Sequence, residues 1–318
     1  MAMGGGDPVV LWSESEAGAC VGPLRPLGGG GGGSGWSRTG VYLIAKSGER
    51  KLFAKFAPGA AAVQMFQGEA EGLLALRHAA AASTPRGFVV PEVVYAGPGA
   101  GGGLIVMEHL TLALGRNDGA AFGTALALLH TAPPLHPQAA AGSFGFPADN
   151  TIGATPQSNG FLGDWVEFYR ERRLGRMLQL AGDARLNFLG ERLLPRLGEF
   201  FDDIPCMPPS TLHGDLWDGN TGFLSDGRPV LFDPAVYYGH SEADFGMSWC
   251  SAAFTREAME AYFQIVPKSP GFARRKPLYE LYHILNHYLL FGGGYYDQAY
   301  SILEALVKDL GPPSPLYT

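Results

Sequence analysis

The sequence predicts an α+β fold of two lobes, with a β-rich N-lobe and a mainly helical C-lobe. The chain has 318 residues, which is enough for roughly two domains. A run of six glycines, 28–33, lies between short apolar stretches that are typical of strands. Beyond residue 111 the apolar residues follow mostly helical spacing. We therefore expect an N-terminal extension over 1–19, the N-lobe over 20–110 and the C-lobe over 111–318.

In the N-lobe, apolar runs alternate with turn residues. Strands are predicted over 39–45, 51–56, 89–96 and 104–110. Between the second and third of these, residues 63–77 have the spacing of a helix with one apolar face. In the C-lobe, apolar stripes predict helices around 122–129, 278–285 and 299–306.

The composition argues against several classes of protein. There are 23 Lys and Arg against 30 Asp and Glu, a net charge of -7, which disfavours general binding of nucleic acid or of anionic membranes. No stretch reaches the roughly 18 apolar residues that would span a bilayer. Three cysteines are too few for a disulfide scaffold, and Met1–Val10 lacks the pattern of a secretory signal. These features predict a cytoplasmic protein, a monomer or weak homodimer, or a plastid protein whose transit segment has been removed.

The glycine run is followed by a strand, and this order matters. A dinucleotide-binding fingerprint requires a helix directly after its glycines. Because a strand follows here, the glycine run does not indicate a dinucleotide-binding fold. Strand, glycine loop and strand is the order that kinases place over ATP phosphates, where missing side chains let backbone N–H groups approach the anion. A flexible surface loop is the plain alternative. The predicted phosphate-binding residues are Gly30, Gly31, Gly32, Gly33 and Ser34.

The most specific segment is Thr211-Leu-His-Gly-Asp-Leu-Trp-Asp-Gly-Asn, followed by Val230-Leu-Phe-Asp-Pro. Asp215 and Asn220 have the spacing of the kinase catalytic loop, and Asp233 ends an apolar run as the kinase metal-binding Asp does. Phosphoryl transfer needs a carboxylate to accept the hydroxyl proton, and oxygen ligands for Mg²⁺. We predict Asp215 as the base, and Asn220 and Asp233 as Mg²⁺ ligands. Single residues of this kind are more often turn residues that bond their own backbone.

Upstream residues complete the pattern. Lys55 lies in a strand after the glycine run, where a kinase lysine reaches the ATP phosphates. Glu69, in the following helix, is its expected ion-pair partner. Glu71 competes for this role but would lie on a different face of the helix. The hinge that binds adenine is predicted at three consecutive residues, Glu108, His109 and Leu110.

With these residues in view, the sequence resembles the fructosamine/ketosamine-3-kinase family over residues ~20–310. The motifs that carry the resemblance are His213-Gly-Asp-Leu-Trp-Asp-Gly-Asn, Phe144-Gly-Phe, Asn150-Thr-Ile-Gly, Thr155-Pro-Gln-Ser-Asn-Gly, Tyr238-Gly-His-Ser-Glu-Ala-Asp and Phe291-Gly-Gly-Gly-Tyr. The resemblance implies a bilobal protein-kinase-like fold with ATP and Mg²⁺ as cofactors. It implies phosphorylation of the sugar O3′ of ketosamines on glycated amines or glycated proteins, which leads to deglycation. It also makes His287 a wall of the sugar pocket, with helix–helix packing as the alternative. The position of Trp217 next to Asp215 favours a stacking surface for the sugar adduct over a core anchor.

The chain departs from the family in its glycine loop, which has no cysteine. Thiol control through this loop is therefore not expected, although Cys20 lies eight residues before it. Cys206 and Cys250 are expected to be buried or inert. The arginines at 170–176 are expected on a solvated helix face.

Two other functions stay open at this point. One is a small-molecule kinase of the aminoglycoside or choline kinase type. The other is a nucleotide-binding pseudokinase scaffold, which the intact set of Lys55, Asp215, Asn220 and Asp233 disfavours.

Overall fold

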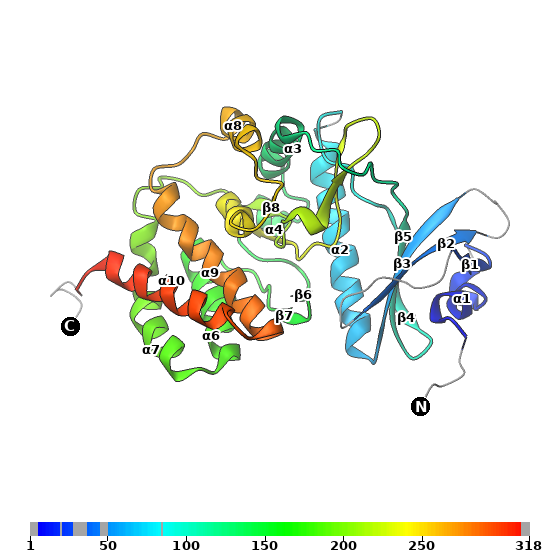
Figure 1. The fold of residues 1–318 in the computed structure, drawn as a ribbon, viewed down its shortest axis with the longest axis horizontal. Helices are drawn as coiled ribbons and strands as arrows, with labels where there is room; N and C mark the ends of the chain where they lie inside the picture. Colours follow the sequence, from blue (N-terminus) through cyan, green and yellow to red (C-terminus); the bar gives the residue numbers. More distant parts are fainter. Residues whose placement is uncertain (1–5, 20, 28–36, 45–49, 84, 313–318) are drawn as a thin grey trace.

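The computed structural model describes residues 6–19, 21–27, 37–44, 50–83 and 85–312, and it has two lobes (Figure 1). The N-lobe is built on an antiparallel five-stranded sheet with the strand order β1-β2-β3-β5-β4. Its strands are β1 (Leu24–Pro26), β2 (Arg38–Ile44), β3 (Lys51–Pro58), β4 (Val93–Gly99) and β5 (Gly102–Glu108). The predicted β-rich N-lobe is thus confirmed, although the strand predicted over 89–96 begins and ends later.

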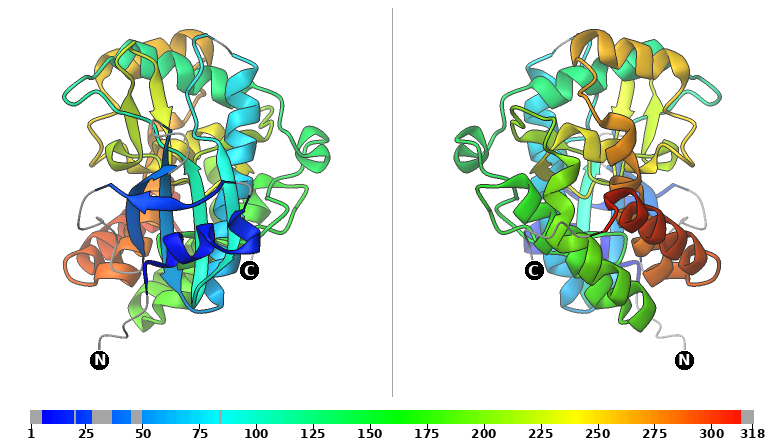
Figure 2. Two further views of the ribbon diagram at one scale, coloured as in Figure 1. Left: turned by 90° about the vertical axis from the view of Figure 1, so that its right-hand side faces the viewer. Right: turned by 90° about the vertical axis from the view of Figure 1, so that its left-hand side faces the viewer.

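Alternation along β3 decides what each face of the sheet carries. Leu52 and Ala54 are buried under the short helix α1 (Pro8–Ser13). Lys55 and Ala57 are also buried, and Ala57 packs in the larger core with helix α2 (Ala61–Ala81). Successive side chains of a strand point to opposite faces of the sheet. Lys55 therefore points to the same face as Ala57, opposite to the face that α1 covers. Figure 2 shows α1 on the face of the sheet that is remote from the C-lobe.

Helix α1 lies in the segment that the sequence treats as an extension. Its N-terminus is capped by Asp7, whose carboxylate accepts hydrogen bonds from the backbone N–H groups of Val9 and Val10. Trp12 is buried against Tyr95 of the sheet, with ring centroids 4.7 Å apart. Residues 8–13 therefore belong to the core of the N-lobe.

The C-lobe is mainly helical. Its helices are α3 (Gly119–Thr131), α4 (Pro137–Ala140), α5 (Trp165–Phe168), α6 (Gly175–Ala181), α7 (Ala184–Leu193), α8 (Arg256–Ile265), α9 (Phe272–Phe291) and α10 (Tyr295–Leu310). Three two-stranded sheets lie among them: β6 (Asn150–Ile152) with β7 (Thr155–Gln157), β8 (Ser210–Leu212) with β11 (Tyr237–Gly239), and β9 (Thr221–Phe223) with β10 (Pro229–Leu231). Within the described residues, no helix is long and apolar enough to cross a membrane.

Helix α2 lies close against the C-lobe at two glycines. A Cβ atom on Gly68 would lie 2.9 Å from the Cβ of Asn150, and one on Gly72 would lie 3.0 Å from a methyl group of Val236. Both partners belong to the C-lobe. The helix therefore approaches the C-lobe as closely as backbone contact allows.

One expectation about the C-lobe is wrong. Arg173 lies in a π-helical turn between α5 and α6 and is fully buried instead of solvated. Its guanidinium lies 3.9 Å from the ring centroid of Tyr237 and donates to the side-chain oxygen of Asn159 at 2.6 Å and to the carbonyl of Ser158 at 2.9 Å. The π turn shifts the helical register, so the run of arginines does not stay on one face.

Helix packing in the C-lobe gives a test of the fold. At Gly123 of α3, an added Cβ would lie 1.9 Å from the carbonyl oxygen of Ala258 on α8. Helix propensity alone would favour Ala there by about 1 kcal/mol. We predict the opposite: Gly123→Ala should lower the free energy of unfolding by about 1–3 kcal/mol, because the two helix backbones must separate. Urea unfolding measures this. Gly198→Ala, where the nearest atom is 4.0 Å away, is the control and should change stability little; an unchanged Gly123→Ala would contradict the packing.

Candidate functional site

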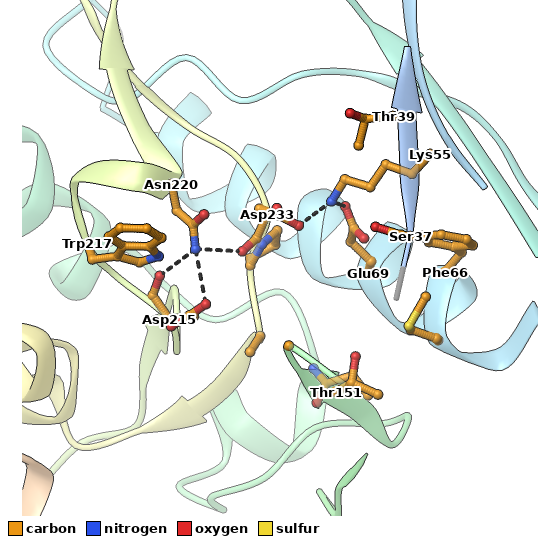
Figure 3. Close-up of a pocket in the computed structure, with 15 residues that line it drawn as sticks. Ser37, Thr39, Lys55, Phe66, Glu69, Thr151, Asp215, Trp217, Asn220 and Asp233 are labelled. Atoms are coloured by element: carbon orange, nitrogen blue, oxygen red, sulfur yellow. Dashed lines mark hydrogen bonds and ion pairs between the residues drawn. The ribbon is translucent and has the colours of Figure 1, made fainter. Parts of the chain in front are cut away.

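Two cavities meet between the lobes. A polar cavity of about 300 Å³ is shown in Figure 3; it is lined by Ser37, Thr39, Lys55, Met65, Phe66, Glu69, Asn150, Thr151, Gly153, Asp215, Trp217, Asn220, Asp233, Pro234 and Ala235. A more apolar cavity of about 260 Å³ is lined by Val41, Phe53, Pro91, Met107, Glu108, His109, Leu110, Leu112 and Phe232, with Thr39, Lys55 and Asp233. The last three residues line both, so the two cavities form one continuous site.

Lys55 lies at the junction of the two cavities. Its ammonium donates to Glu69 of α2 at 2.7 Å and also to Asp233 of the C-lobe. Burial alone would lower the pKa of Lys55, but the charges of Glu69 and Asp233 outweigh it and raise that pKa above its usual range. The ammonium therefore stays charged and joins strand β3, helix α2 and the C-lobe.

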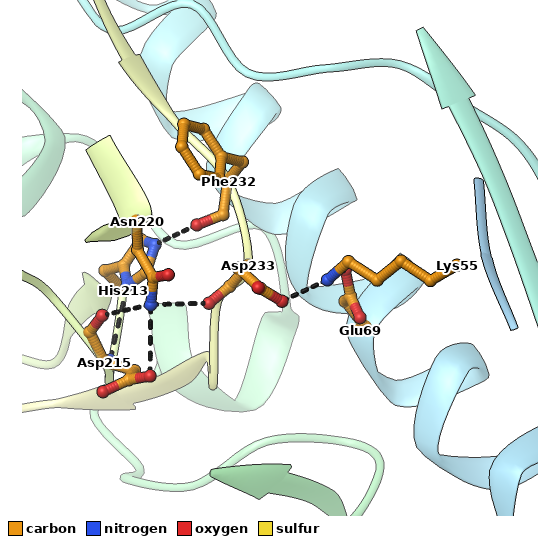
Figure 4. A network of polar contacts seen from close by, with 7 residues as sticks. All are labelled: Lys55, Glu69, His213, Asp215, Asn220, Phe232 and Asp233. Atoms are coloured by element: carbon orange, nitrogen blue, oxygen red, sulfur yellow. Dashed lines mark hydrogen bonds and ion pairs between the residues drawn. The ribbon is translucent and has the colours of Figure 1, made fainter. Parts of the chain in front are cut away.

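Asn220 organises the C-lobe side of the site (Figure 4). Its amide nitrogen donates to the backbone carbonyl of Asp215 at 2.9 Å, to the carboxylate of Asp215 at 3.1 Å and to the carbonyl of Asp233 at 3.2 Å. Because three acceptors surround the nitrogen, the amide orientation is fixed and its oxygen is the atom left for a further ligand.

The Asp215 carboxyl is tuned for proton transfer. Burial and the nearby charge of Asp233 raise its pKa to about 7, and the hydrogen bond from Asn220 only partly opposes them. A carboxylate with a pKa near the working pH is suited to act as a general base.

Hydrogen bonds to Asp244 hold the turn that carries Asp215. The Asp244 carboxylate accepts hydrogen bonds from the backbone N–H groups of His213 and Gly214, both at 2.8 Å, and contacts a ring nitrogen of His130 at 3.0 Å. Gly214 has a φ of 80°, and a Cβ there would lie 2.0 Å from the carbonyl oxygen of Ala235. Only glycine fits at this position.

His213 is a neutral support for the same turn. Burial lowers its pKa despite the nearby carboxylate of Asp244. Its Nε2 lies 3.0 Å from the Phe232 carbonyl and its Nδ1 lies 3.3 Å from the Asp215 N–H. Since a carbonyl only accepts, Nε2 carries the proton and Nδ1 accepts. The imidazole thus connects the segments of Asp215 and Asp233.

Asp233 adopts a left-handed backbone conformation, with a φ of 59°. Its side chain is 53% exposed and faces the polar cavity. The free oxygen of Asn220 and this carboxylate are hard oxygen ligands of the kind that Mg²⁺ prefers. The described residues include no group of three or more His, Cys, Asp or Glu that could enclose a metal. Two protein ligands fit Mg²⁺, which usually keeps waters and takes the remaining ligands from phosphates.

The apolar cavity contains the predicted hinge. Glu108 ends strand β5, and His109 and Leu110 follow it along the cavity wall. Burial, together with the charge of Lys51, lowers the pKa of His109, so this side chain is neutral near pH 7. A flat apolar slot beside a strand end offers stacking surfaces and backbone groups to a heterocyclic base.

The remaining predicted site residues differ in where they lie. Gly30, Gly31, Gly32, Gly33 and Ser34 lie outside the described residues, as does Cys20. Trp217 lines the polar cavity and is 38% exposed. His287 lines neither cavity; its ring packs near Trp249 and Tyr295, at centroid distances of 6.3 and 5.0 Å.

The two described cysteines are expected to be buried or inert. Cys206 and Cys250 are both exposed, so of these alternatives only an inert thiol remains. Partial burial and the negative charge of Asp218 and Asp215 raise the pKa of the Cys250 thiol, which keeps it protonated and poorly reactive.

The β6–β7 hairpin is a part of the site to which the sequence assigned no role. Asn150 and Thr151 line the polar cavity. The buried Gln157 donates to the side-chain oxygen of Asn150 at 2.8 Å and to the Ala235 carbonyl at 3.1 Å, and it accepts from the Tyr282 hydroxyl at 2.6 Å. These bonds hold the chain that follows Asp233. The motif Asn150-Thr-Ile-Gly was the available signal, but the contact partners are distant in sequence.

Comparisons with known proteins agree with this geometry. A family model described as fructosamine kinase matches residues 34–309. A chloroplastic protein-ribulosamine 3-kinase of Oryza sativa subsp. japonica is 40% identical over 98% of this chain and 86% of its own. A ketosamine-3-kinase of Mus musculus is 33% identical over 81% of this chain and 88% of its own.

Solved structures show the same architecture. A protein assigned as a fructosamine-3-kinase of Thermobifida fusca YX-ER1 has a TM-score of 0.72 at 28% identity, covering 90% of this chain and 94% of that one. An aminoglycoside phosphotransferase has a TM-score of 0.57 at 15% identity, covering 91% of this chain and 94% of that one, which supports the fold alone. The predicted protein-kinase-like fold is confirmed.

The raised pKa of Asp215 predicts how stability depends on pH. The folded protein favours the protonated carboxyl, so this group costs stability progressively as pH rises from about 3.8, its unfolded value, to about 7. Without metal and nucleotide, Asp215→Asn should melt above wild type by about 2–4 °C beyond pH 7, and the difference should shrink towards pH 4. Thermal melts from pH 4 to 9 measure this. Asp226→Asn, at an exposed carboxylate with a lowered pKa, should not stabilise; a variant at Asp215 that melts below wild type at pH 8 would contradict the prediction.

Proposed function

The chain belongs to the fructosamine kinase family, and from this premise we propose that it is an ATP-dependent ketosamine-3-kinase. The proposed substrates are fructosamine or ribulosamine adducts on amines and proteins, phosphorylated on the sugar O3′. One observation carries the proposal: Lys55, Asp215, Asn220 and Asp233 face one cavity, and an apolar slot opens beside it. Phosphorylation at O3′ would make the adduct unstable and restore the amine, as the family resemblance implies.

The proposed reaction assigns one task to each group. Asp215 accepts the proton of the O3′ hydroxyl as the oxygen forms its bond to the γ-phosphorus of ATP. The bond from that phosphorus to the bridging oxygen breaks, and ADP leaves with the electron pair. Lys55 neutralises charge on the α- and β-phosphates, and Glu69 holds the ammonium in place.

Asn220 and Asp233 would hold Mg²⁺ through their side-chain oxygens. When bound, the ion would neutralise negative charge on the phosphate oxygens. It would also offset the charge of Asp233, one of the causes that raise the pKa of Asp215. The base would then be more fully ionised in the loaded enzyme than in the free one.

The nucleotide base would occupy the apolar cavity, between Val41, Phe53 and Phe232 and against the hinge at 108–110. The ketosamine would lie in the polar cavity beside Trp217 and Thr151. An ATP-consumption assay tests the proposal directly. Wild type should release ADP with glycated lysines and not with a panel of aminoglycosides; the reverse preference would favour a small-molecule kinase.

We predict that Asp215→Asn lowers kcat on a ketosamine by about 10³-fold or more and leaves the affinity for ATP nearly unchanged, because base and positioning roles are lost together. Coupled measurement of ADP release gives kcat, and calorimetry gives the ATP affinity. Asp226→Asn, on an exposed turn, is the matched control. If the Asp215 variant kept a tenth of wild-type activity, its role as the base would be wrong.

We predict a different outcome for Asp233→Ala. Loss of this ligand should abolish the gain in nucleotide affinity that Mg²⁺ provides, while binding of metal-free ATP should change little or improve, since a repulsive charge is removed. Paired calorimetric titrations with MgATP and with ATP in chelator measure the two cases. An unchanged affinity for MgATP would count against the metal role of Asp233.

A further inference from the structure

A second hollow lies on the surface of the C-lobe. It is a surface groove of about 420 Å³ between helices α9 and α10, lined by Trp249, Glu280, Ile284, Asp297, Gln298, Ser301 and Ile302, which we call the amine groove. Its walls combine an exposed indole, two isoleucines and two carboxylates. Trp249 is 40% exposed, so a large apolar ring faces solvent at this place.

The amine groove is linked to the catalytic loop through the segment that carries Trp249. Trp249 lies in the turn that follows residues 241–247, and this turn touches the catalytic loop where the Ala252 N–H donates to the Asp218 carboxylate at 3.1 Å. Asp218 directly follows Trp217, which lines the substrate cavity. A ligand that extended from the substrate cavity past Trp217 would run along this segment towards the groove.

Cys250 directly follows Trp249. Besides partial burial, the negative charges of Asp218, Asp215 and Glu280 raise the pKa of its thiol, so the surroundings of this turn are acidic.

The charges of the groove favour a cation. Glu280 is partly neutralised by Lys276, at 3.1 Å. Asp297 is exposed in the first turn of α10, and it forms no ion pair within the part of the chain that the structure describes. A tryptophan face attracts ammonium and guanidinium groups, and an apolar wall suits the methylene stem of a lysine.

Resting on the proposed function, we propose that the amine groove binds the polypeptide next to the glycated lysine of a protein substrate, and that it favours substrates with basic residues beside that lysine. The glycated lysine projects from its own backbone, so a kinase that acts on it must meet the flanking residues. Trp249 supplies the contact area and Glu280 with Asp297 supplies the charge preference. The groove acts on substrate binding and leaves the chemical step to the Asp215 site.

The test uses four substrates in an ADP-release assay: fructosyl-methylamine, and three peptides with one fructosyl-lysine flanked by Arg, Ala or Glu. Wild type should prefer the Arg-flanked to the Glu-flanked peptide by about tenfold in kcat/KM, through KM. Trp249→Ala should lower kcat/KM by about tenfold on the peptides and less than about twofold on fructosyl-methylamine. The double variant Glu280→Gln, Asp297→Asn should abolish the ranking of the peptides.

Matched controls are Phe188→Ala, an exposed ring on α7, and Glu260→Gln, an exposed carboxylate on α8. Both should behave as wild type on all four substrates. The proposal is overturned if wild type does not rank the peptides, or if Trp249→Ala acts equally on the peptides and on fructosyl-methylamine. If wild type turns over none of the four substrates in either their fructosyl or their ribulosyl form, the proposed function itself fails, which is a separate and recognisable result.

Discussion

The relative placement of the two lobes depends on the ammonium of Lys55. This ammonium joins a strand of the N-lobe, helix α2 and the segment after β10 through two carboxylates that are distant from it in sequence. A buried ammonium is costly unless it is paired, and so is the buried carboxylate of Glu69, whereas the Asp233 carboxylate is half exposed. The three groups therefore stabilise one relative placement of the lobes, and the cavities at their junction follow from it.

Negative charge dominates the remainder of the site. The charges of Asp215, Asp233 and Asp244 affect one another, and the ammonium of Lys55 and the neutral imidazole of His213 lie beside them. The fold tolerates this because backbone N–H groups and His130 compensate Asp244, while Asp233 is exposed to solvent. The cost is thus concentrated on Asp215, the group whose raised pKa the proposed chemistry uses.

The sequence predicted the parts of the molecule that depend on local patterns. Alternation and helical spacing located the sheet, α2 and the main helices, and the spacing of Asp215, Asn220 and Asp233 located the C-lobe side of the site. It could not predict Arg173, because a π turn moves that side chain into the core and no local signal marks the shift. The hydrogen bonds of the Gln157 amide could not be predicted either, because its partners Tyr282 and Ala235 are distant along the chain. Helix α1 was not predicted from the sequence, because six residues are too few to show the spacing of apolar residues that marks a helix.

The two glycines of α2 have a consequence for control of the enzyme. In a kinase that is switched by displacement of this helix, the glutamate partner of the lysine must be able to leave the site. Here the helix backbone rests on Asn150 and Val236 with no side chain between them. On its other side the helix is pressed against the sheet, where a Cβ on Gly103 of β5 would lie 2.3 Å from the backbone of Ala62. Any swing of Glu69 out of the site would have to separate α2 from both lobes, so control by displacement of this helix is costly in this chain.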